Sequence, residues 1–236
     1  MKDFLYFMFV GGLFAVNAWS LYKDRSKNNF VYRIVLFTRH KDWLWALLLI
    51  AGVFTTGALI EPYVPKALHW SIFSILDKDG ANANIEIMQG FGSAKVATST
   101  ASVIISRLFL LVIYTILFLI IPKAAFWEEK TFRYGTTSFN KKTIYRNIRF
   151  GLLHCLIGVQ LWIGLLLALV GMVFAIRYIR EYKKRAGFTI TSSQYPYKEI
   201  NTDYPNEIAL LSTTSLHGKY NLILITLLFL SLLLTQ

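Results

Sequence analysis

Long apolar stretches, separated by segments rich in Lys and Arg, limit how this chain can fold more than any other feature. A helix needs ~20 predominantly apolar residues to cross a bilayer, where it satisfies its own backbone hydrogen bonds. Hydrophobic residues make up 55% of the 236 residues, whereas charged residues make up 16%. Since a soluble domain usually has about 25% charged residues, the sequence predicts an all-α, polytopic membrane helical bundle. The apolar stretches are residues 4–22, 43–60, 103–121, 150–176 and 208–234.

The stretch 150–176 contains no Asp, Glu, Lys or Arg, but its length does not fit a simple crossing. It is too long for one straight helix and too short for two full spans of ~20 residues each. Because basic residues flank both of its ends, we expect two short helices that return to the same side, with a break near Gly158. Together with one helix from each of the other stretches, this predicts about six membrane-embedded helices.

The net charge of +12 is concentrated between the apolar stretches. Cytoplasmic loops of membrane proteins carry an excess of Lys and Arg, so residues 23–42 and 123–149 are predicted to be cytoplasmic loops. No polar segment is long enough for a separate soluble domain, and we therefore expect a lipid bilayer, and not nucleic acid, as a partner. We divide the chain into N-terminal membrane helices with an outer segment, residues 1–102, and a membrane core, residues 103–236.

The first motif, a pair of carboxylates followed by an arginine, lies just beyond the third apolar stretch and consists of Glu128, Glu129 and Arg133. Residues four apart share a helix face, so Glu129 and Arg133 are predicted to form an ion pair that neutralises charge and fixes the helix. Glu128 lies on a different face and has no good cationic partner at helical spacing. A carboxylate in that position suits a general base that accepts a proton from water.

Two further motifs have the same spacing: Phe150 with His154, and His217 with Asn221. Ionisable groups within a membrane are costly, so they are functional candidates. A single histidine in an apolar helix is more often a packed structural residue than a catalyst. Together with Glu128, however, these side chains supply what amide hydrolysis requires, which is a base that activates water and donors that stabilise an oxyanion.

The same residues also fit a metal site. Two histidines and a carboxylate, here His154, His217 and Glu128, can bind zinc and leave one position open for water. The HExxH motif of many zinc proteases is absent from the sequence. The sequence alone therefore leaves both interpretations open.

In this order and in these apolar contexts, the three motifs resemble those of the CPBP family of intramembrane proteases, also called Abi, which includes the CAAX prenyl endopeptidases. Residues 126–133, 150–158 and 215–222 carry the likeness, which covers the C-terminal half of the chain. Two features depart from the family pattern. Tyr134 stands where Gly often follows the motif Arg. Lys219 adds a charge that points away from the His217–Asn221 face and is expected either to reach the membrane interface or to disturb the site.

The resemblance implies an all-helical membrane fold with its active site in the cytoplasmic half of the bilayer. It implies that Glu128 activates water with assistance from His154, and that His217 and Asn221 form the oxyanion hole. Family members have been described both as metalloproteases and as metal-independent glutamate proteases, and we expect the second, without a cofactor, although a metal such as zinc stays open. The substrate would be a membrane-associated peptide or protein, prenylated or unmodified. The supporting residues would be Glu129, Arg133 and Phe150.

Two other functions stay open at this point. The first is a non-catalytic membrane partner, or a protein of the bacteriocin-immunity type, that keeps the motifs as structural polar packing. The second is a small transporter that uses the buried carboxylate and histidines as a proton relay. The sequence has no internal repeat, which counts against the transporter.

Overall fold

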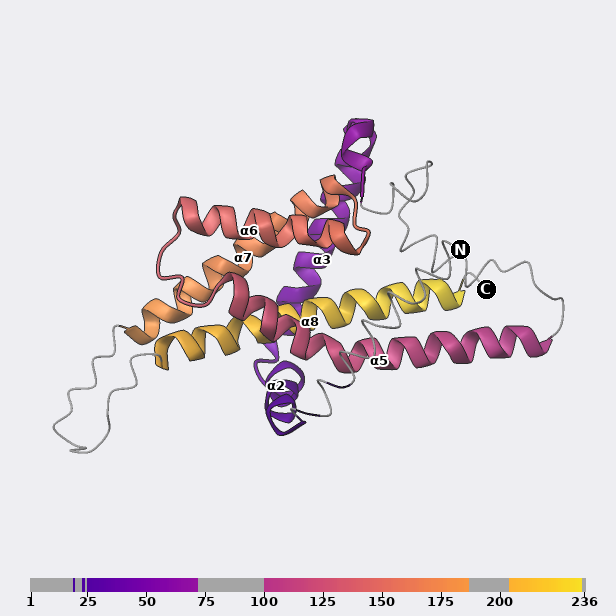
Figure 1. The fold of residues 1–236 in the computed structure, drawn as a ribbon, viewed down its shortest axis with the longest axis horizontal. Helices are drawn as coiled ribbons and strands as arrows, with labels where there is room; N and C mark the ends of the chain where they lie inside the picture. The colour runs from indigo at the N-terminus through magenta and orange to yellow at the C-terminus, as the bar shows by residue number, and fades with distance from the viewer. Residues whose placement is uncertain (1–18, 20–22, 24, 72–99, 187–203, 235–236) are drawn as a thin grey trace.

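The structure is a computed structural model that describes residues 19, 23, 25–71, 100–186 and 204–234. Helices account for 88% of these residues, which contain no strand, so the predicted all-α class is confirmed for this part of the chain. The elements, shown in Figure 1, are α2 (Arg25–Phe37), α3 (Lys41–Ile60), the 3₁₀ turns η1 (Glu61–Tyr63) and η2 (Lys66–His69), α5 (Thr100–Phe132), α6 (Lys141–Leu153), the 3₁₀ turn η4 (His154–Ile157), α7 (Leu161–Ala186) and α8 (Tyr204–Leu234).

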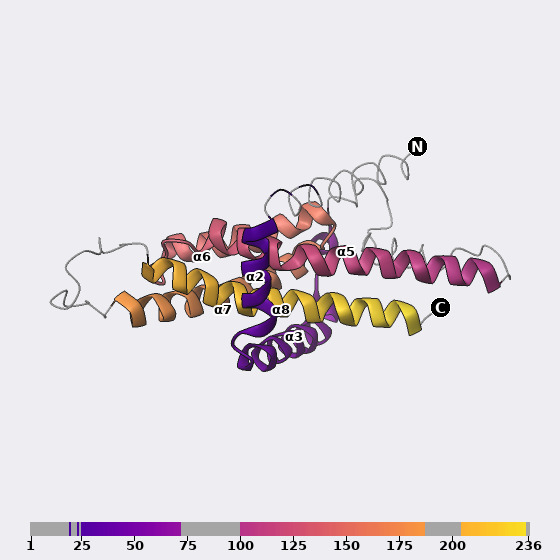
Figure 2. The ribbon, with the colours of Figure 1, turned by 90° about the horizontal axis from the view of Figure 1, so that it is seen from below.

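Helix α8 is the central element, because α2, α3, α5 and α7 all pack against it. Figures 1 and 2 both show α5 and α8 side by side, and α6 lies along α7. One buried cluster joins α3, α7 and α8 through Ala46, Phe174 and Tyr220, among others. Successive faces of α8 therefore meet different helices, so the residues of one short segment of α8 can serve different contacts.

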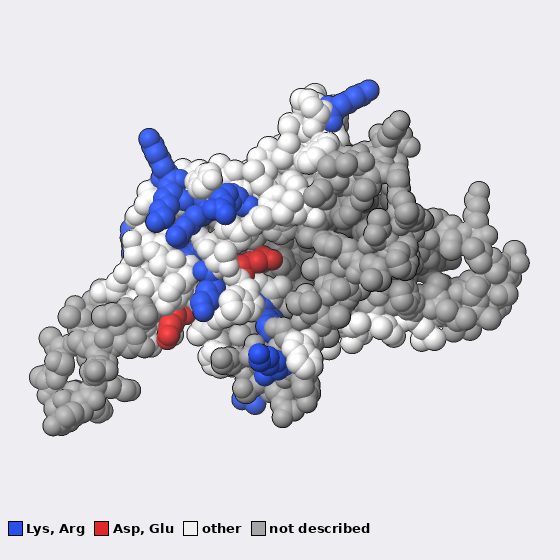
Figure 3. All heavy atoms as spheres, viewed as in Figure 1, with Lys and Arg blue, Asp and Glu red and all other residues white. Residues whose placement is uncertain are grey.

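Three of the described helical segments are long and apolar enough to cross a membrane: Lys41–Tyr63, Leu110–Phe132 and Leu161–Ala186. Large apolar side chains such as Leu48 and Leu169 are exposed on them, as expected of surfaces that face lipid. On the face shown in Figure 3, Lys and Arg side chains gather over α6 and α2. Apart from Trp19, the first predicted stretch lies outside the described residues.

Helix α5 continues past residue 121, the predicted end of the third apolar stretch, to Phe132. Pro122 lies inside the helix and is buried, although proline lacks a backbone N–H and usually weakens a helix interior. As a result, Glu128 and Glu129 lie near the end of the same long helix that forms the apolar stretch.

Two segments that were predicted to be loops are largely helical. Residues 23–42 contain α2, and residues 123–149 contain the end of α5 and most of α6. The side chain of Asn140 accepts a hydrogen bond from the backbone N–H of Thr143, which caps the start of α6. Charged residues do not prevent these helices, because one face of each can pack on the bundle while the other stays exposed.

The break predicted near Gly158 is confirmed, but the prediction of two short helices is wrong for the second one. Helix α7 runs for 26 residues and is long enough to cross a membrane. Gly158 has φ 91° and ends η4, and α7 begins shortly after it at Leu161. Only glycine adopts this left-handed conformation at little steric cost, so the chain can reverse here. Of the predicted polar loop, residues 180–207, the first part belongs to α7 and the last to α8, and residues 187–203 lie outside the described part of the chain.

Helices α6 and α7 run antiparallel and come very close at Gly151. A Cβ atom at this position would clash with the carbonyl oxygen of Gly164 and would lie 2.6 Å from the backbone nitrogen of Ala168. Both are backbone atoms, which cannot turn aside as a flexible side chain can. This contact fixes the end of α6, where Phe150 and His154 lie.

We predict that Gly151→Ala lowers the free energy of unfolding by about 1–3 kcal/mol, because the added methyl group overpacks a backbone contact. Thermal unfolding of the purified protein in detergent measures the change. Gly52→Ala is the matched control, since no atom lies within 4 Å of a Cβ there. Equal stability of the two variants would contradict the close contact between α6 and α7.

Candidate functional site

A buried ion pair lies at the centre of the candidate site. Arg133 Nη1 donates to Glu129 Oε1 at 2.9 Å, and both side chains are 0% exposed. Arg133 Nη2 donates to Asn147 Oδ1 at 3.1 Å, and Asn147 Nδ2 donates to the carbonyl of Thr143 at 2.8 Å. The ion pair expected from the four-residue spacing is present, although Arg133 lies directly after the end of α5, and the bond to Asn147 links the pair to α6.

His217 lies between the two glutamates of α5. Its Nδ1 donates to Glu129 Oε1 at 2.8 Å, and its Nε2 lies 3.3 Å from Glu128 Oε2. The imidazole is 2% exposed, so these contacts are shielded from solvent. Helical spacing within α5 offered Glu128 no good partner, whereas the structure places the imidazole of His217, from α8, beside it.

Phe150 lies among Arg133 and the two histidines of the site. Its ring centroid lies 4.1 Å from the Arg133 guanidinium carbon, 4.9 Å from the centroid of the His154 ring and 5.7 Å from that of His217. On another side of His217, Phe174 stacks with a centroid distance of 4.7 Å. An aromatic ring over a desolvated cation attracts it, and the rings also exclude water, which strengthens the electrostatic contacts nearby.

Glu128 and His154 are the more accessible members of the site. The side chain of Glu128 is 33% exposed, whereas that of Glu129 is 0% exposed. Glu128 Oε2 makes no hydrogen bond to the residues that the structure describes. His154 Nδ1 lies 2.8 Å from the carbonyl oxygen of Phe150, which can only accept, so Nε2 is the basic nitrogen of this ring. Two adjacent carboxylates thus lie in different environments.

Asn221 lies one helical turn beyond His217 on α8 and is partly buried. Within the described ranges its side chain has no hydrogen-bond partner, so its place in an oxyanion hole stays a prediction. In the same part of the chain, no three His, Cys, Asp or Glu side chains are grouped as a metal site requires.

Sequence reasoning missed two residues of the site, Asn147 and Phe174. Asn147 lies three residues before Phe150 and shares its helix face, so helical spacing could have identified it. Phe174 is one of many apolar residues in α7, and no spacing in the sequence distinguishes it. Its contact with His217 depends on how α7 packs against α8.

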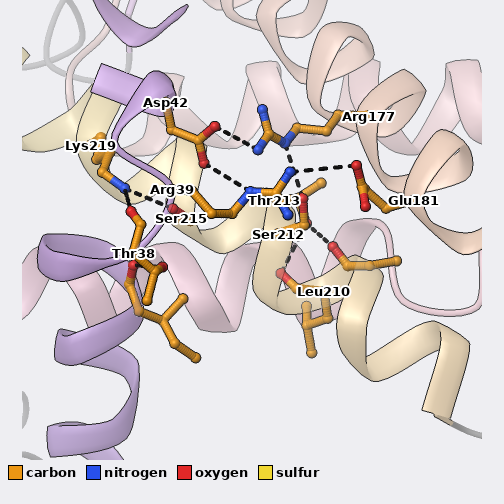
Figure 4. Close-up of polar contacts among 12 residues, drawn as sticks. Thr38, Arg39, Asp42, Arg177, Glu181, Leu210, Ser212, Thr213, Ser215 and Lys219 are labelled. Carbon is orange, nitrogen blue, oxygen red and sulfur yellow. Dashed lines mark hydrogen bonds and ion pairs between the residues drawn. The ribbon is translucent and has the colours of Figure 1, made fainter. Parts of the chain in front are cut away.

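The opposite face of α8 holds a second polar cluster, which Figure 4 shows. Lys219 is 0% exposed, and its Nζ donates to the carbonyl oxygen of Thr38 at 2.6 Å and to Ser215 Oγ at 2.8 Å. Thr38 follows the C-terminal end of α2, where the helix dipole favours a cation. Lys219 faces away from the site, as the sequence predicted, and it is buried, where it ties α2 to α8 instead of reaching the membrane interface.

Arg177 extends this cluster to α3 and α7, as Figure 4 also shows. Its Nη2 donates to Asp42 Oδ1 at 2.7 Å, and its Nε donates to Ser212 Oγ at 3.2 Å. Arg39, which has φ 52°, lies 3.5 Å from Asp42 and 3.4 Å from Glu181. The cluster holds α3, α7 and α8 together on the side of α8 that faces away from the site.

No family model matches this chain, and neither does any curated protein or solved structure.

We predict that Arg133→Met lowers the free energy of unfolding by about 3–5 kcal/mol, because it leaves the Glu129 carboxylate buried without its cation. Lys130→Met is the control, since Lys130 lies three residues before Arg133 but is exposed, and it should change stability by about 0.5 kcal/mol or less. Unfolding of both variants in detergent gives the comparison. A fully stable Arg133→Met protein would show that the pair is dispensable.

We predict that Lys219→Met lowers the free energy of unfolding by about 1–3 kcal/mol, less than Arg133→Met does. The reason is that the carbonyl of Thr38 then has no ammonium group from which to accept a hydrogen bond. Ser215→Ala keeps that hydrogen bond and removes only the second acceptor of Lys219, so it should lower the free energy of unfolding by less. The same unfolding measurement ranks the two variants. The opposite ranking would argue against Lys219 as the group that joins α2 to α8.

Proposed function

We propose that this protein is an integral, multi-pass membrane endopeptidase that uses Glu128 to activate water. The supporting observation is the contrast between two adjacent carboxylates. Glu129 is buried and paired with Arg133, whereas Glu128 is one third exposed and faces His217 Nε2 at 3.3 Å. Enzymes often place paired carboxylates in different environments so that each can have its own role. Glu128 is the one available to accept a proton.

In the proposed reaction, Glu128 takes a proton from water while the water oxygen attacks the carbonyl carbon of the scissile amide. Negative charge then develops on the carbonyl oxygen, where preorganised donors stabilise it. The proposed donors are Asn221 and His217, whose Nδ1 donates to Glu129 and whose Nε2 can donate to the oxyanion when both ring nitrogens carry a proton. The proton on Glu128 passes to the leaving amine as the C–N bond breaks, and His154 assists this transfer.

We further propose about six membrane-embedded helices with the site in the cytoplasmic half of the bilayer. Asn147, which binds Arg133, packs at Gly171, and the first cation of α7 is Arg177, six residues farther along. Six residues of helix span about 9 Å, less than half of a ~30 Å hydrocarbon core. The site is therefore near the basic ends of α6 and α7, which favours the cytoplasmic side. A substrate at this depth would be a membrane-associated peptide or protein, prenylated or unmodified.

We predict that Glu128→Gln lowers the rate of peptide cleavage by roughly 10²–10⁴-fold, because the amide cannot accept a proton from water. The assay presents prenylated and unmodified membrane peptides to the purified full chain and identifies products by mass spectrometry. Glu207→Gln, which changes an exposed carboxylate at the start of α8, is the matched control and should cleave at the wild-type rate. Unfolding temperatures confirm that both variants are folded.

The same assay with a chelator distinguishes hydrolysis that depends on a metal from hydrolysis by a carboxylate without a metal. Activity that survives the chelator supports water activation by the carboxylate alone, whereas lost activity would show that the reaction depends on a metal. If the folded wild type cleaves no peptide, or if Glu128→Gln cleaves at the wild-type rate, the proposal is wrong. The buried network would then be better explained as the structural core of a non-catalytic membrane partner.

A further inference from the structure

One face of α6 carries exposed basic and aromatic side chains that the proposed site does not use. Lys141, Tyr145 and Arg149 are four residues apart from one to the next, so they share this face, and we term them the α6 stripe. All three are exposed, Tyr145 by 61%, whereas Thr143 and Asn147 face the bundle. Figure 3 shows Lys and Arg side chains gathered over this helix.

The contacts between α6 and α7 place Arg149 beside the apolar part of α7. Asn147 packs against Gly171, and Gly151 packs against Ala168. Arg149 lies between Asn147 and Gly151 in the sequence. It therefore lies at the same height in the bundle as the turn of α7 from Ala168 to Gly171. That turn is at least six residues, or about 9 Å, from the first cation of α7. An exposed arginine is therefore located within the apolar length of the bundle.

A guanidinium at this depth is costly unless it reaches the membrane boundary or binds an anion. The guanidinium carbon of Arg149 lies 5.8 Å from the centre of the Tyr145 ring, one turn nearer the start of α6. Helical side chains point towards the N-terminal end, so both side chains lean towards Lys141. No carboxylate of the described residues pairs with a cation of the stripe. The stripe therefore presents uncompensated positive charge beside a phenol.

We propose that the α6 stripe binds the headgroup of an anionic phospholipid. Phosphate oxygens can accept two hydrogen bonds from the guanidinium of Arg149 and further ones from the ammonium of Lys141. The amphipathic ring of Tyr145 suits the boundary between headgroups and acyl chains. Next along the same side of the chain, Leu153 is 44% exposed and Leu156 is 52% exposed, and they offer an acyl chain an apolar surface.

A lipid accounts for both the cationic part of this surface and the apolar part formed by the exposed leucines. An acidic peptide would match the cations but would leave the exposed leucines without an apolar partner. The stripe residues make no hydrogen bond or ion pair with Glu128, Glu129 or His217 in the described part of the chain. The lipid proposal therefore stands or fails separately from the catalytic one.

The test uses the full chain purified in detergent and two lipids with the same acyl chains, phosphatidylglycerol and phosphatidylcholine. Native mass spectrometry measures how much of each lipid the protein retains. Wild type should prefer phosphatidylglycerol. Each cation near an anionic headgroup is worth about fivefold in affinity, so Lys141→Gln combined with Arg149→Gln should weaken phosphatidylglycerol binding roughly 25-fold. The control, Lys183→Gln with Arg185→Gln, removes the same charge from the exposed end of α7 and should keep the preference.

Three results would overturn the proposal. The first is equal retention of the two lipids by wild type, and the second is the same loss in the control as in the stripe variant. The third is unchanged phosphatidylglycerol binding in the stripe variant together with weaker binding of an acidic peptide, which would assign the stripe to a peptide. Arg149→Lys keeps the charge and should retain most of the lipid, which separates headgroup binding from helix packing. Thermal unfolding in lipid-free detergent confirms that each variant is folded.

Discussion

Charge buried in an apolar bundle must be compensated, and the arrangement of this protein depends on that constraint. Glu129 of α5 meets Arg133, which directly follows the helix, Asn147 of α6 accepts from the same guanidinium, and His217 of α8 donates to Glu129. Each of these contacts brings in a different helix. Apolar contacts between leucine-rich helices are alike along much of their length, so we infer that the polar contacts determine which turns of these helices meet.

Helix α8 is held on several faces at the level of the site. His217 contacts the glutamates of α5, and two residues later Lys219 binds the carbonyl of Thr38 at the end of α2. Between them, a Cβ atom on Gly218 would lie 2.8 Å from the methyl groups of Val35, so α2 and α8 are in close contact there. The position of His217 is thus set by its own partners and also by contacts on the far side of its helix.

Sequence spacing predicts the contacts within a helix but not those between helices. Glu129 with Arg133 and Phe150 with His154 are each four residues apart, and both pairs are in contact. The contact of His217 with Glu129 spans 88 residues of sequence, and no local pattern shows which helices will face each other. Charge composition predicted loops where α2 and much of α6 form, because it does not reveal that one face of a charged helix can pack on the bundle.

The most direct test of this account is a double-mutant cycle between Glu129 and His217, measured as the free energy of unfolding of the full chain in detergent. The cycle compares Glu129→Gln, His217→Leu and the double variant with wild type. Because the two side chains share a buried contact of 2.8 Å, we predict a coupling energy of about 0.5–3 kcal/mol. Effects that add to within ~0.3 kcal/mol would contradict the central role of this contact.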